Sequence, residues 1–548
     1  MIEQLRIAGD QLRTAWDNYF RVYSRLEYDY PGKKTSSGYS FPPEIARQLE
    51  TELAFISSYE PKIQEIKVTI GSTRNYCCGL APINTLPPEI LARIFYLSLP
   101  PSCDIHLISS GNAHYSRYPD HLGQVCALWR RVAISTQALW CHIDLSDIRP
   151  YSEGLVTRAS IHAARAGKLP IELHIFTNDD YSFECNNRYL FLPHISRRVE
   201  TLELRMAGPF REFHSGLFKL LLQKHPILDK LALSSESSYY NNFLVSNSYD
   251  TIDWGRDSWP LIIDCSEDDI ENSFSSLSVL HLRGIFPLWN STAYHGLVDL
   301  RLLSTPNWSH IGEAELITIL RSSPGLRILH FGLQIDDPIA GDEGVTPLPL
   351  KDLQVVHIFV EDHEEMRLHP DSILRLLAPG RELLQLCISG FYTPGTDSVT
   401  ELEKFIFRSR LSHFYSRYNF PPLSLLLHQA GDIQRIVLKD LGYQNRVELP
   451  ATWMQIKQFA SLPRLTSIDI IDSALLQSDV RLLYECCPSG ITLQSSRVVE
   501  VDLEADIEFI LLSPDELVET FPGISLEEND RIYCDDSTLG WDEWIGIA

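Results

Sequence analysis

The segment "LSVLHLRGIF", Leu277 to Phe286, is a short strand-like unit in which apolar residues alternate with polar ones. Alternation of this kind predicts a half-buried β-strand. Similar units recur along the middle of the chain and begin at Val199, Leu228, Leu277, Leu297, Leu326, Leu353, Leu383, Ile433 and Leu465. Their starting points are separated by 29, 49, 20, 29, 27, 30, 50 and 32 residues. The sequence therefore predicts a series of related strands at a period close to thirty residues.

A helical pattern, "EGLVTRASIHAARAG", precedes these units, and further helical patterns fill several of the gaps between them: "REFHSGLFKLLLQKHP", "GEAELITILRSSP", "HPDSILRLLAPG" and "TWMQIKQFASLP". Each unit is thus one strand followed by a return helix. A lone unit cannot bury its apolar strand face, so we expect the units to stack into an α/β solenoid with a parallel sheet. The competing fold is a flat doubly wound sheet, since its βαβ units have a similar length. The two gaps near 50 residues predict either a degenerate unit or a long loop.

The N-terminal part is predicted to be helical. Residues 1–30 carry Leu5, Ala8, Leu12, Ala15, Tyr19 and Val22 at steps of three and four residues. A second helix is expected from about Glu44 to Lys67, and Pro61 should kink or restart it. Two helices joined by a loop indicate an antiparallel hairpin over residues 1–80. The alternative is a coiled coil that pairs with another chain.

The segment "INTLPPEILARIFYLSLPP", Ile83 to Pro101, predicts a helix that begins on two prolines. A missing N–H costs little in the first turn, and the fixed φ favours the helical start. Ile90 and Ile94, together with Leu91 and Phe95, place apolar groups on two adjoining strips of this helix. We expect one strip to pack internally and the other to meet a partner, because exposed apolar edges usually mark interfaces.

A second helical segment follows an insert at about residues 100–120. Together the two segments resemble an F-box through Leu86-Pro87, Glu89-Ile90-Leu91, Ile94-Phe95, Val125-Cys126, Trp129-Arg130 and Leu139-Trp140. They are also similar to the F-box-like proteins of mushroom-forming fungi, in which a helical hairpin often precedes the motif and divergent leucine-rich units follow. The resemblance covers about 60 residues by motif and the remainder by architecture. It implies a three-helix domain over residues 81–147 and a leucine-rich-repeat-like solenoid over residues 148–500.

The resemblance also implies a function and a set of site residues. The chain would be a non-catalytic substrate-recognition subunit of an SCF-type cullin ubiquitin ligase, and its solenoid would hold a protein client. A Skp-type adaptor, and through it a cullin, would bind by way of Leu86, Pro87, Ile90, Leu91, Ile94, Val125, Cys126 and Trp129. The structural residues of the domain would be Phe95, Leu139 and Trp140, with Trp140 joining it to the solenoid.

Three alternatives stay open at this point. The adaptor residues could all be core of a small helical domain, and the chain could be an interaction scaffold with no ubiquitin role. The insert could be a surface loop, or it could reshape the adaptor-binding face.

Composition narrows the classes of partner. The 548 residues are 44% hydrophobic and 22% charged, with a net charge of -25. A general nucleic-acid or anionic-membrane binder would be basic, so we expect neither partner. No stretch reaches eighteen apolar residues, so no membrane span is expected. The 11 scattered cysteines indicate a reducing compartment, cytoplasmic or nuclear. Residues 501–548 form an acidic segment, which either aids solubility or attracts a basic partner.

Candidate chemistry is sparse, and we expect no enzyme, no metal and no cofactor. The segment "HIFVEDHEEMRLH" offers His357, His363, Glu364, Glu365 and His369, but their offsets do not share a helix face. The insert offers Cys103, His106, His114 and His121 without a recognised metal spacing. The adjacent pairs Cys77-Cys78 and Cys486-Cys487 are predicted to be buried thiols.

Overall fold

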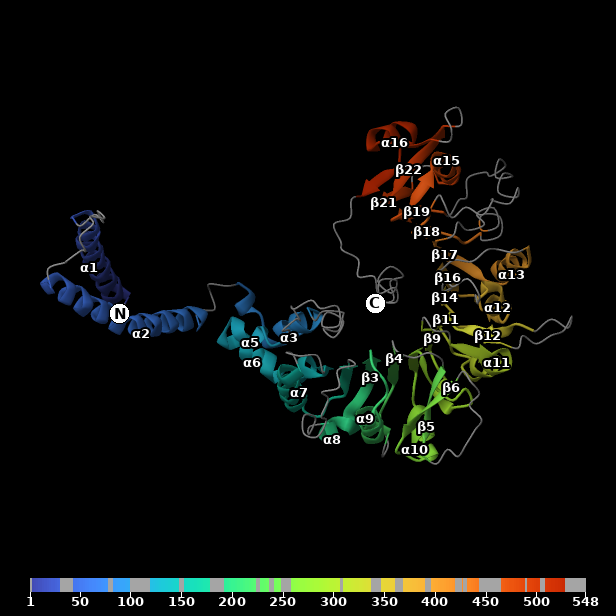
Figure 1. Ribbon diagram of the computed structural model, residues 1–548, viewed down its shortest axis with the longest axis horizontal. Coiled ribbons are helices and arrows are strands. Elements are labelled where there is room, and N and C mark those ends of the chain that lie inside the picture. Colours follow the sequence, from blue (N-terminus) through green and yellow to red (C-terminus); the bar gives the residue numbers. More distant parts are fainter. Residues whose placement is uncertain are drawn as a thin grey trace, which may run out of the picture. The chain divides into compact units, whose positions relative to one another are not determined.

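The computed structural model describes residues 2–29, 43–76, 82–98, 119–146, 152–177, 192–222, 227–235, 241–247, 258–305, 309–336, 346–359, 368–389, 396–418, 426, 431–442, 465–487, 490–502 and 508–527 (Figure 1). The chain divides into two compact units, Met1–Thr85 and Leu86–Ala548. None of the helices in the described ranges combines the length and the apolar composition that a membrane span requires.

The first unit contains two long helices, α1 (Ile2–Asp29) and α2 (Pro43–Tyr76), and the short 3-10 helix η2 (Pro82–Thr85). Helix α2 does not restart at Pro61, and it extends well beyond the end expected near Lys67. The Tyr19 hydroxyl donates a hydrogen bond of 2.7 Å to Glu52 Oε2 and so connects α1 with α2. Both helices expose apolar side chains, and Leu12 and Leu53 are each 67% exposed. This unit therefore buries little apolar surface of its own.

The second unit is a mixed α/β structure built on one large parallel sheet that is not closed into a barrel. Among the described residues the sheet has fourteen strands, and every neighbouring pair is parallel. In spatial order the strands are β1 (His142–Ser146), β2 (Ile171–Thr177), β3 (Val199–Met206), β4 (Lys230–Ser235), β7 (Val279–Arg283), β9 (Asp299–Leu303), β11 (Ile328–Gly332), β14 (Val355–Phe359), β16 (Leu383–Ser389), β17 (Arg410–Arg417), β18 (Arg435–Lys439), β19 (Ser467–Ile471), β21 (Ile491–Gln494) and β24 (Ser525–Glu527). This spatial order is also the chain order, whereas a doubly wound sheet reverses its order at a switch point.

All nine predicted units are strands of this sheet, and each begins within two residues of its expected start. The gap of 50 residues after Leu383 hides one further strand, β17. The gap of 49 residues after Leu228 instead contains β5 (Asn241–Ser246) and β6 (Ser258–Ile263), which form a separate sheet with β8 (Ile285–Pro287). The boundary expected at residue 500 falls inside β22 (Arg497–Asp502), and β24 extends the large sheet beyond it.

Helices follow many of the strands, and Figure 1 shows α9 to α13 along one side of the large sheet. The helices after β1 are α7 (Ser152–Arg165), α8 (Leu192–Ile195), η4 (Ser196–Arg198), α9 (Glu212–Leu222), α10 (Glu267–Phe274), η5 (Thr292–Tyr294), α11 (Glu313–Ser322), α12 (Pro370–Leu374), α13 (Thr396–Phe407), α15 (Gln477–Cys486) and α16 (Pro514–Thr520). Short strands form three smaller groups: β10 (His310–Gly312) with β12 (Gln334–Asp336), β13 (Leu348–Leu350) with β15 (Leu377–Pro379), and β20 (Ala474–Leu476) with β22 and β23 (Glu508–Leu511). The segment from Thr452 to Pro463, where a helix was expected, lies outside the described residues.

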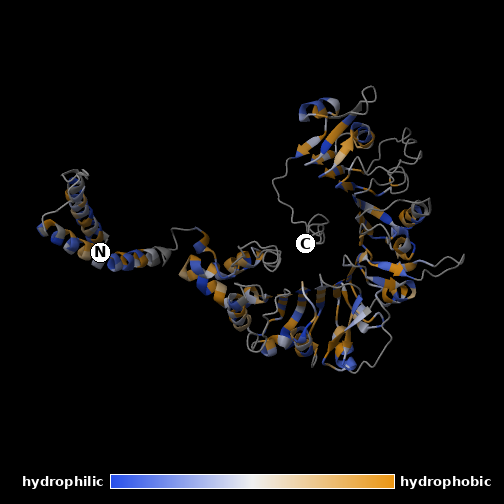
Figure 2. Ribbon diagram, viewed as in Figure 1, coloured by the Kyte–Doolittle hydropathy of each residue, from blue (hydrophilic) through white to orange (hydrophobic). Residues whose placement is uncertain are grey.

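One apolar row crosses the large sheet from β1 to β21. Each residue of this row is the register partner of the next, and all belong to a single buried cluster: Ile143, Leu173, Leu202, Leu231, Leu280, Leu300, Leu329, Val356, Leu386, Phe414, Ile436, Ile468 and Ile491. Apolar and polar residues alternate along many of the strands (Figure 2). Burying one such leucine contributes about 1.5–3 kcal/mol, so this continuous row contributes substantially to the stability of the unit.

Candidate functional site

Helix α3 (Pro88–Leu97) begins on the two prolines, as predicted. Pro87 precedes the helix with extended geometry, φ -54° and ψ 145°, and Pro88 is the first helical residue. The carbonyl oxygen of Pro87 accepts hydrogen bonds from the amides of Ile90 at 3.0 Å and Leu91 at 3.1 Å. The prolines thus start the helix, because the N–H groups they lack have no partner within the first turn.

The two apolar strips of α3 have different environments. Leu91 and Phe95 form the inner strip and are 0% and 2% exposed. The ring centroid of Phe95 lies 4.8 Å from that of Trp129, and α3 packs against the helix that carries Trp129. The outer strip repeats at steps of three and four residues: Pro87 is exposed, Ile90 is 49% exposed, Ile94 is half-buried and Leu97 is 66% exposed. The prediction that one strip packs internally is confirmed.

The second half of the motif forms α5 (Leu122–Val125) and α6 (Ala127–Ser135). Cys126 breaks the helix between them, and its Sγ accepts a hydrogen bond of 3.5 Å from the amide of Trp129. The Arg130 side chain donates from Nε to the carbonyl oxygen of Gly123 at 2.7 Å, which fixes the angle between α5 and α6. Val125 is left 52% exposed at the end of α5.

The eight residues expected to bind an adaptor fall into three classes. Pro87, Ile90 and Val125 are exposed, and Leu86, Ile94 and Trp129 are half-buried. Leu91 is fully buried and Cys126 is 8% exposed, so these two residues belong to the core of the domain rather than to its surface. We add Leu97 of α3 to the exposed and half-buried residues and call the resulting set the apolar edge: Leu86, Pro87, Ile90, Ile94, Leu97, Val125 and Trp129.

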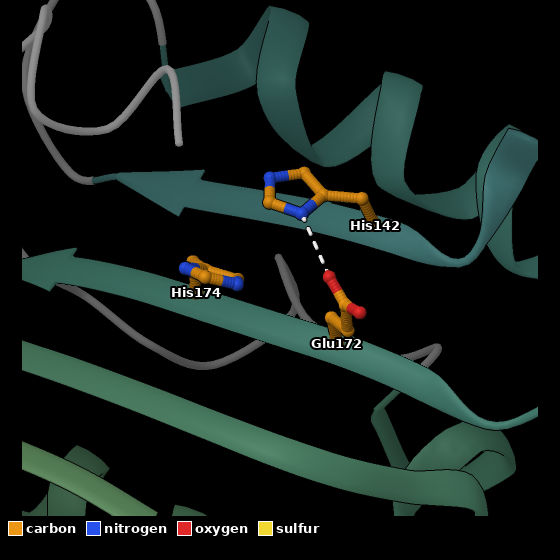
Figure 3. A group of neighbouring side chains, drawn as sticks. All are labelled: His142, Glu172 and His174. Carbon is orange, nitrogen blue, oxygen red and sulfur yellow. Dashed lines mark hydrogen bonds and ion pairs between the residues drawn. The ribbon is translucent and has the colours of Figure 1, made fainter. Parts of the chain in front are cut away.

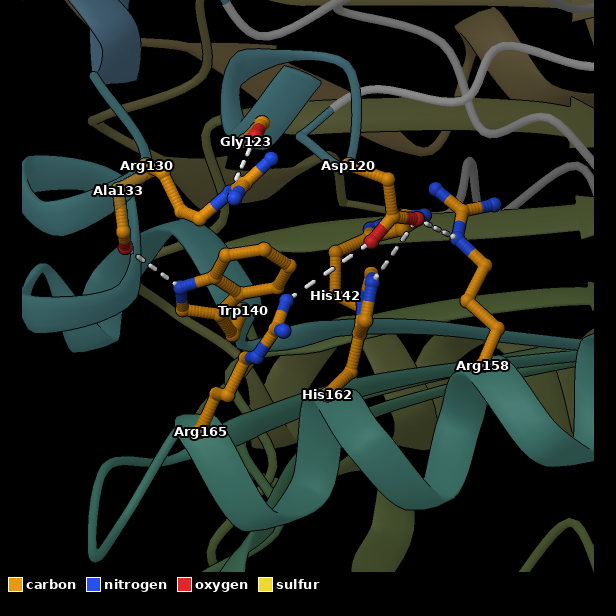
Figure 4. A network of polar contacts seen from close by, with 9 residues as sticks. All are labelled: Asp120, Gly123, Arg130, Ala133, Trp140, His142, Arg158, His162 and Arg165. Carbon is orange, nitrogen blue, oxygen red and sulfur yellow. Dashed lines mark hydrogen bonds and ion pairs between the residues drawn. The ribbon is translucent and has the colours of Figure 1, made fainter. Parts of the chain in front are cut away.

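The three residues expected to be structural are all buried. Leu139 and Trp140 lie in η3 (Gln137–Trp140), and each is 1% exposed. The Trp140 indole Nε1 donates a hydrogen bond of 2.8 Å to the carbonyl oxygen of Ala133 in α6. On its other side the Trp140 ring meets two residues of α7, with the Arg165 guanidinium 4.2 Å and the His162 ring 5.1 Å from its centroid (Figure 4). Trp140 therefore joins α6 to α7, the first helix after β1.

Asp120 strengthens this junction from the segment before α5. Its Oδ2 accepts a hydrogen bond from Arg158 Nε at 3.0 Å and lies 3.6 Å from His162 Nε2, and its Oδ1 lies 3.9 Å from Arg165 (Figure 4). Burial alone would raise the pKa of Asp120, but the neighbouring His162 and the two arginines outweigh burial and lower that pKa. His162 Nδ1 also hydrogen-bonds the carbonyl oxygen of His142 at 3.0 Å, so the network reaches β1.

A second candidate surface lies on the face of the sheet opposite the apolar row, because successive side chains of a strand alternate between faces. We call this surface the polar face. It contains one row of register partners: Asp144, His174, Glu203, Ala232, His281, Arg301, His330, His357, Cys387, Tyr415, Val437, Asp469 and Thr492.

Ion pairs connect neighbouring strands of the polar face. Asp299 is the centre of one group, because its Oδ2 lies 2.9 Å from His281 Nε2 and 3.1 Å from the Arg301 guanidinium. Burial alone would raise the pKa of Asp299, but its contacts with His281 and the Arg301 guanidinium outweigh burial and hold that pKa well below its usual range. Farther along the sheet, Arg435 Nε lies 2.6 Å from Asp469 Oδ2. The polar face thus carries ordered charges toward both ends of the row, whereas Cys387, Tyr415 and Val437 in between are buried in a small apolar cluster.

Within the described residues, the metal candidates drawn from the sequence do not form a cluster. His357 is fully buried on β14 and contacts Ser389 Oγ through Nε2 at 2.9 Å, and His369 is exposed just before α12. His121 is exposed before α5. The other metal candidates lie outside the described residues: Cys103, His106, His114, His363, Glu364 and Glu365. Cys77 and Cys78, which were predicted to be buried thiols, also lie outside them. Cys487 is a buried free thiol, as expected.

A different group of metal-ligating side chains was missed by the sequence reasoning. His142, Glu172 and His174 each offer one ligand atom, and these atoms all lie within 4.8 Å of one another (Figure 3). A partial signal lay in the two segments that form β1 and β2. Residues two apart share a face of a strand, and the sequence has His142 two residues before Asp144 and Glu172 two residues before His174.

The interpretation of these surfaces depends on their geometry and on the motif resemblance. The chain matches no model of a known protein family, and no curated protein matches it.

Proposed function

We propose that this chain is a non-catalytic substrate-recognition subunit of an SCF-type cullin ubiquitin ligase. In this proposal α3, α5, α6 and η3 form an F-box-like domain whose apolar edge binds a Skp-type adaptor. The large parallel sheet and its helices form a leucine-rich-repeat-like solenoid that holds a protein client. The observation that carries the proposal is the apolar edge.

The apolar edge has the properties of a protein-binding surface. Ile90, Leu97 and Val125 are between 49% and 66% exposed, although residues beside them are fully packed. Burying a side chain of this size in a partner contributes about 1.5–3 kcal/mol, which supports a specific contact. Exposed apolar residues that gather beside a packed interior usually mark an interaction site. The Leu-Pro start and the Trp-Arg pair supply the F-box resemblance at the same place.

The sheet unit supports the client-binding half of the proposal. Its chain-ordered strands and its continuous apolar row are what stacked strand-and-helix units produce. Such an array offers a long surface, and the polar face provides charges already ordered by ion pairs. A client held there would be presented to the ubiquitin-charged enzyme at high effective concentration, and no catalytic side chain would be needed.

The test is adaptor binding by the full chain. We expect the wild-type chain to co-purify with a co-expressed fungal Skp-type adaptor, and Ile90→Asp to weaken that complex at least about tenfold, because the charge would be buried without a partner. Ile161→Asp is the matched control, since Ile161 is 43% exposed on α7, away from the apolar edge.

Two results would reject the proposal. One is a wild-type chain that does not bind the adaptor. The other is an Ile90→Asp variant that binds as well as the Ile161→Asp control. Either result would favour the scaffold without a ubiquitin role.

A further inference from the structure

We propose that His142, Glu172 and His174 bind a divalent transition-metal ion, with zinc as the fitting example. The three residues lie on the adjacent parallel strands β1 and β2, where His142 is the register partner of Glu172 and Asp144 is the partner of His174. One ligand atom from each lies within 4.8 Å of the others, and Figure 3 shows their side chains on the same side of the two strands.

His174 is the observation that points to a ligand. It is 8% exposed, and neither of its ring nitrogens makes a hydrogen bond. Its Nδ1 lies 3.3 Å from Glu203 Oε2 in an ion pair, whereas its buried Nε2 has no such contact. Buried polar atoms without a hydrogen-bond partner are uncommon in folded proteins, and an ordered water or a bound ion is a common reason for one. A metal ion among the three residues would supply such a partner.

The surroundings of His142 match those of a metal-bound histidine. Its Nε2 lies 2.9 Å from Asp144 Oδ1, and Asp144 is itself 6% exposed. Metal-bound histidines usually direct the second ring nitrogen to a carboxylate in this way, which fixes the orientation of the ring. The other nitrogen, Nδ1, lies 3.4 Å from Glu172 Oε2. Ligand atoms around a tetrahedral zinc are about 3.3 Å apart, so these two atoms already have the required spacing.

The ligand types select the class of ion. Two imidazoles and one carboxylate suit zinc and related divalent ions, whereas calcium and magnesium prefer oxygen ligands alone. Three protein ligands leave a fourth position for water. The Glu172 side chain is 57% exposed, which leaves a path for the ion to enter. Since β1 also contacts α7, the ion would stabilise the start of the sheet beside the first helix that packs on it.

The experiment titrates zinc into the full chain after removal of metal by a chelator. We expect one zinc ion per chain at this site and a zinc-dependent rise in the melting temperature. His174→Gln and Glu172→Gln should remove the site, and Asp144→Asn should weaken zinc binding about 10- to 100-fold. Cobalt in place of zinc should give a tetrahedral d–d spectrum without a thiolate charge-transfer band, which separates the site from the cysteines.

His310→Gln is the matched control, because His310 Nδ1 forms a comparable pair with Asp336 at 2.6 Å on other parallel strands. It should keep the zinc stoichiometry of the wild-type chain. The proposal is overturned if the wild-type chain binds no zinc, or if Glu172→Gln binds zinc as tightly as His310→Gln. Glu172 is exposed enough for its variant to fold, so loss of folding in His174→Gln would not obscure the result. Adaptor binding is not part of this readout, so the metal site and the proposed function can fail separately.

Discussion

The indole of Trp140 donates its hydrogen bond to the carbonyl oxygen of Ala133, 2.8 Å away and seven residues earlier in the chain. This bond connects η3 with α6 across the short segment that separates them. It also holds the ring where Arg165 and His162 of α7 cover it. One side chain thus connects α6 and η3 with α7, the first helix that packs on the sheet.

Substitution of Trp140 should separate the contribution of this bond from that of packing. We expect Trp140→Phe to lower the free energy of unfolding by at least about 1 kcal/mol, because the hydrogen bond is lost. Trp140→Ala should cost about 3–5 kcal/mol, because a large buried ring is also removed. Urea unfolding followed by circular dichroism measures both values. A Trp140→Phe variant as stable as the wild type would contradict the role of the hydrogen bond, and equal losses in the two variants would contradict the contribution of packing.

Asp120 should stabilise the same junction in a pH-dependent manner. Its pKa in the folded chain lies below the ordinary value of 3.8, so its contribution is present above that value and is lost as the pH falls through the folded pKa. We expect Asp120→Asn to be less stable than the wild type at pH 7, and the difference to shrink toward pH 3. Urea unfolding at both pH values provides the test. A difference that does not change with pH would contradict the ion-pair assignment.

His142 gives the opposite pH dependence when metal is absent. Its pKa is raised from 6.5 to about 10, so its contribution is fully present below pH 6.5 and is lost as the pH rises through about 10. We expect Glu172→Gln to be less stable than the wild type near neutral pH, with the difference shrinking toward pH 10. Unfolding in the presence of a chelator measures this difference, and NMR titration of the His142 ring checks the pKa directly. A His142 pKa near 6.5 would refute the prediction.

Gly380 should tolerate no side chain, because two neighbouring units approach closely there. It follows β15, and a Cβ at this position would collide with the carbonyl oxygen of Lys351 and lie 2.8 Å from the Cα of Lys351 after β13. We expect Gly380→Ala to lower the free energy of unfolding by about 1–3 kcal/mol. Gly325→Ala is the control, since no atom lies within 4 Å of its added Cβ. Similar stability of the two variants would contradict the close approach.

Leu300 lies near the middle of the apolar row, between Leu280 and Leu329, and is fully buried. Leu300→Ala should cost about 2–5 kcal/mol, because the rigid neighbours cannot close the cavity. Leu383→Ala should cost well under about 2 kcal/mol, because Leu383 is 43% exposed at the start of β16. Thermal unfolding of both variants tests whether the row forms the continuous core.

The repeating strands could be predicted because each carries its own alternation of apolar and polar residues. A different local signal identified the start of α3, because two prolines and two apolar strips at helical spacing lie within one short segment. The strand β17 escaped prediction because apolar and polar residues do not alternate regularly in "RLSHFYSR", as they do in the other units. The pair β5 and β6 escaped for another reason, since its partner β8 follows β7 in the chain and the pairing is not local.

The candidate site was predictable as a segment but not residue by residue. The sequence singled out Leu91 and Cys126 together with Ile90 and Val125. The structure buries the first two and exposes the second two, because the crossing of α3 and α6 decides which side of each helix is covered. The group formed by His142, Glu172 and His174 could not be assembled from sequence, because Glu172 and His174 follow His142 by about thirty residues and meet it only through strand pairing.

The sequence by itself determined the local elements of this protein: strands with one apolar face, return helices between them, and a helix that starts at Pro88. These depend on residue periodicity and backbone preference, which act over a few neighbours. Only the tertiary structure decided the spatial order of the strands, which apolar strip of α3 remains exposed, and which charged side chains meet on the polar face. Those outcomes depend on register between strands and on crossing between helices, which join residues far apart in the chain.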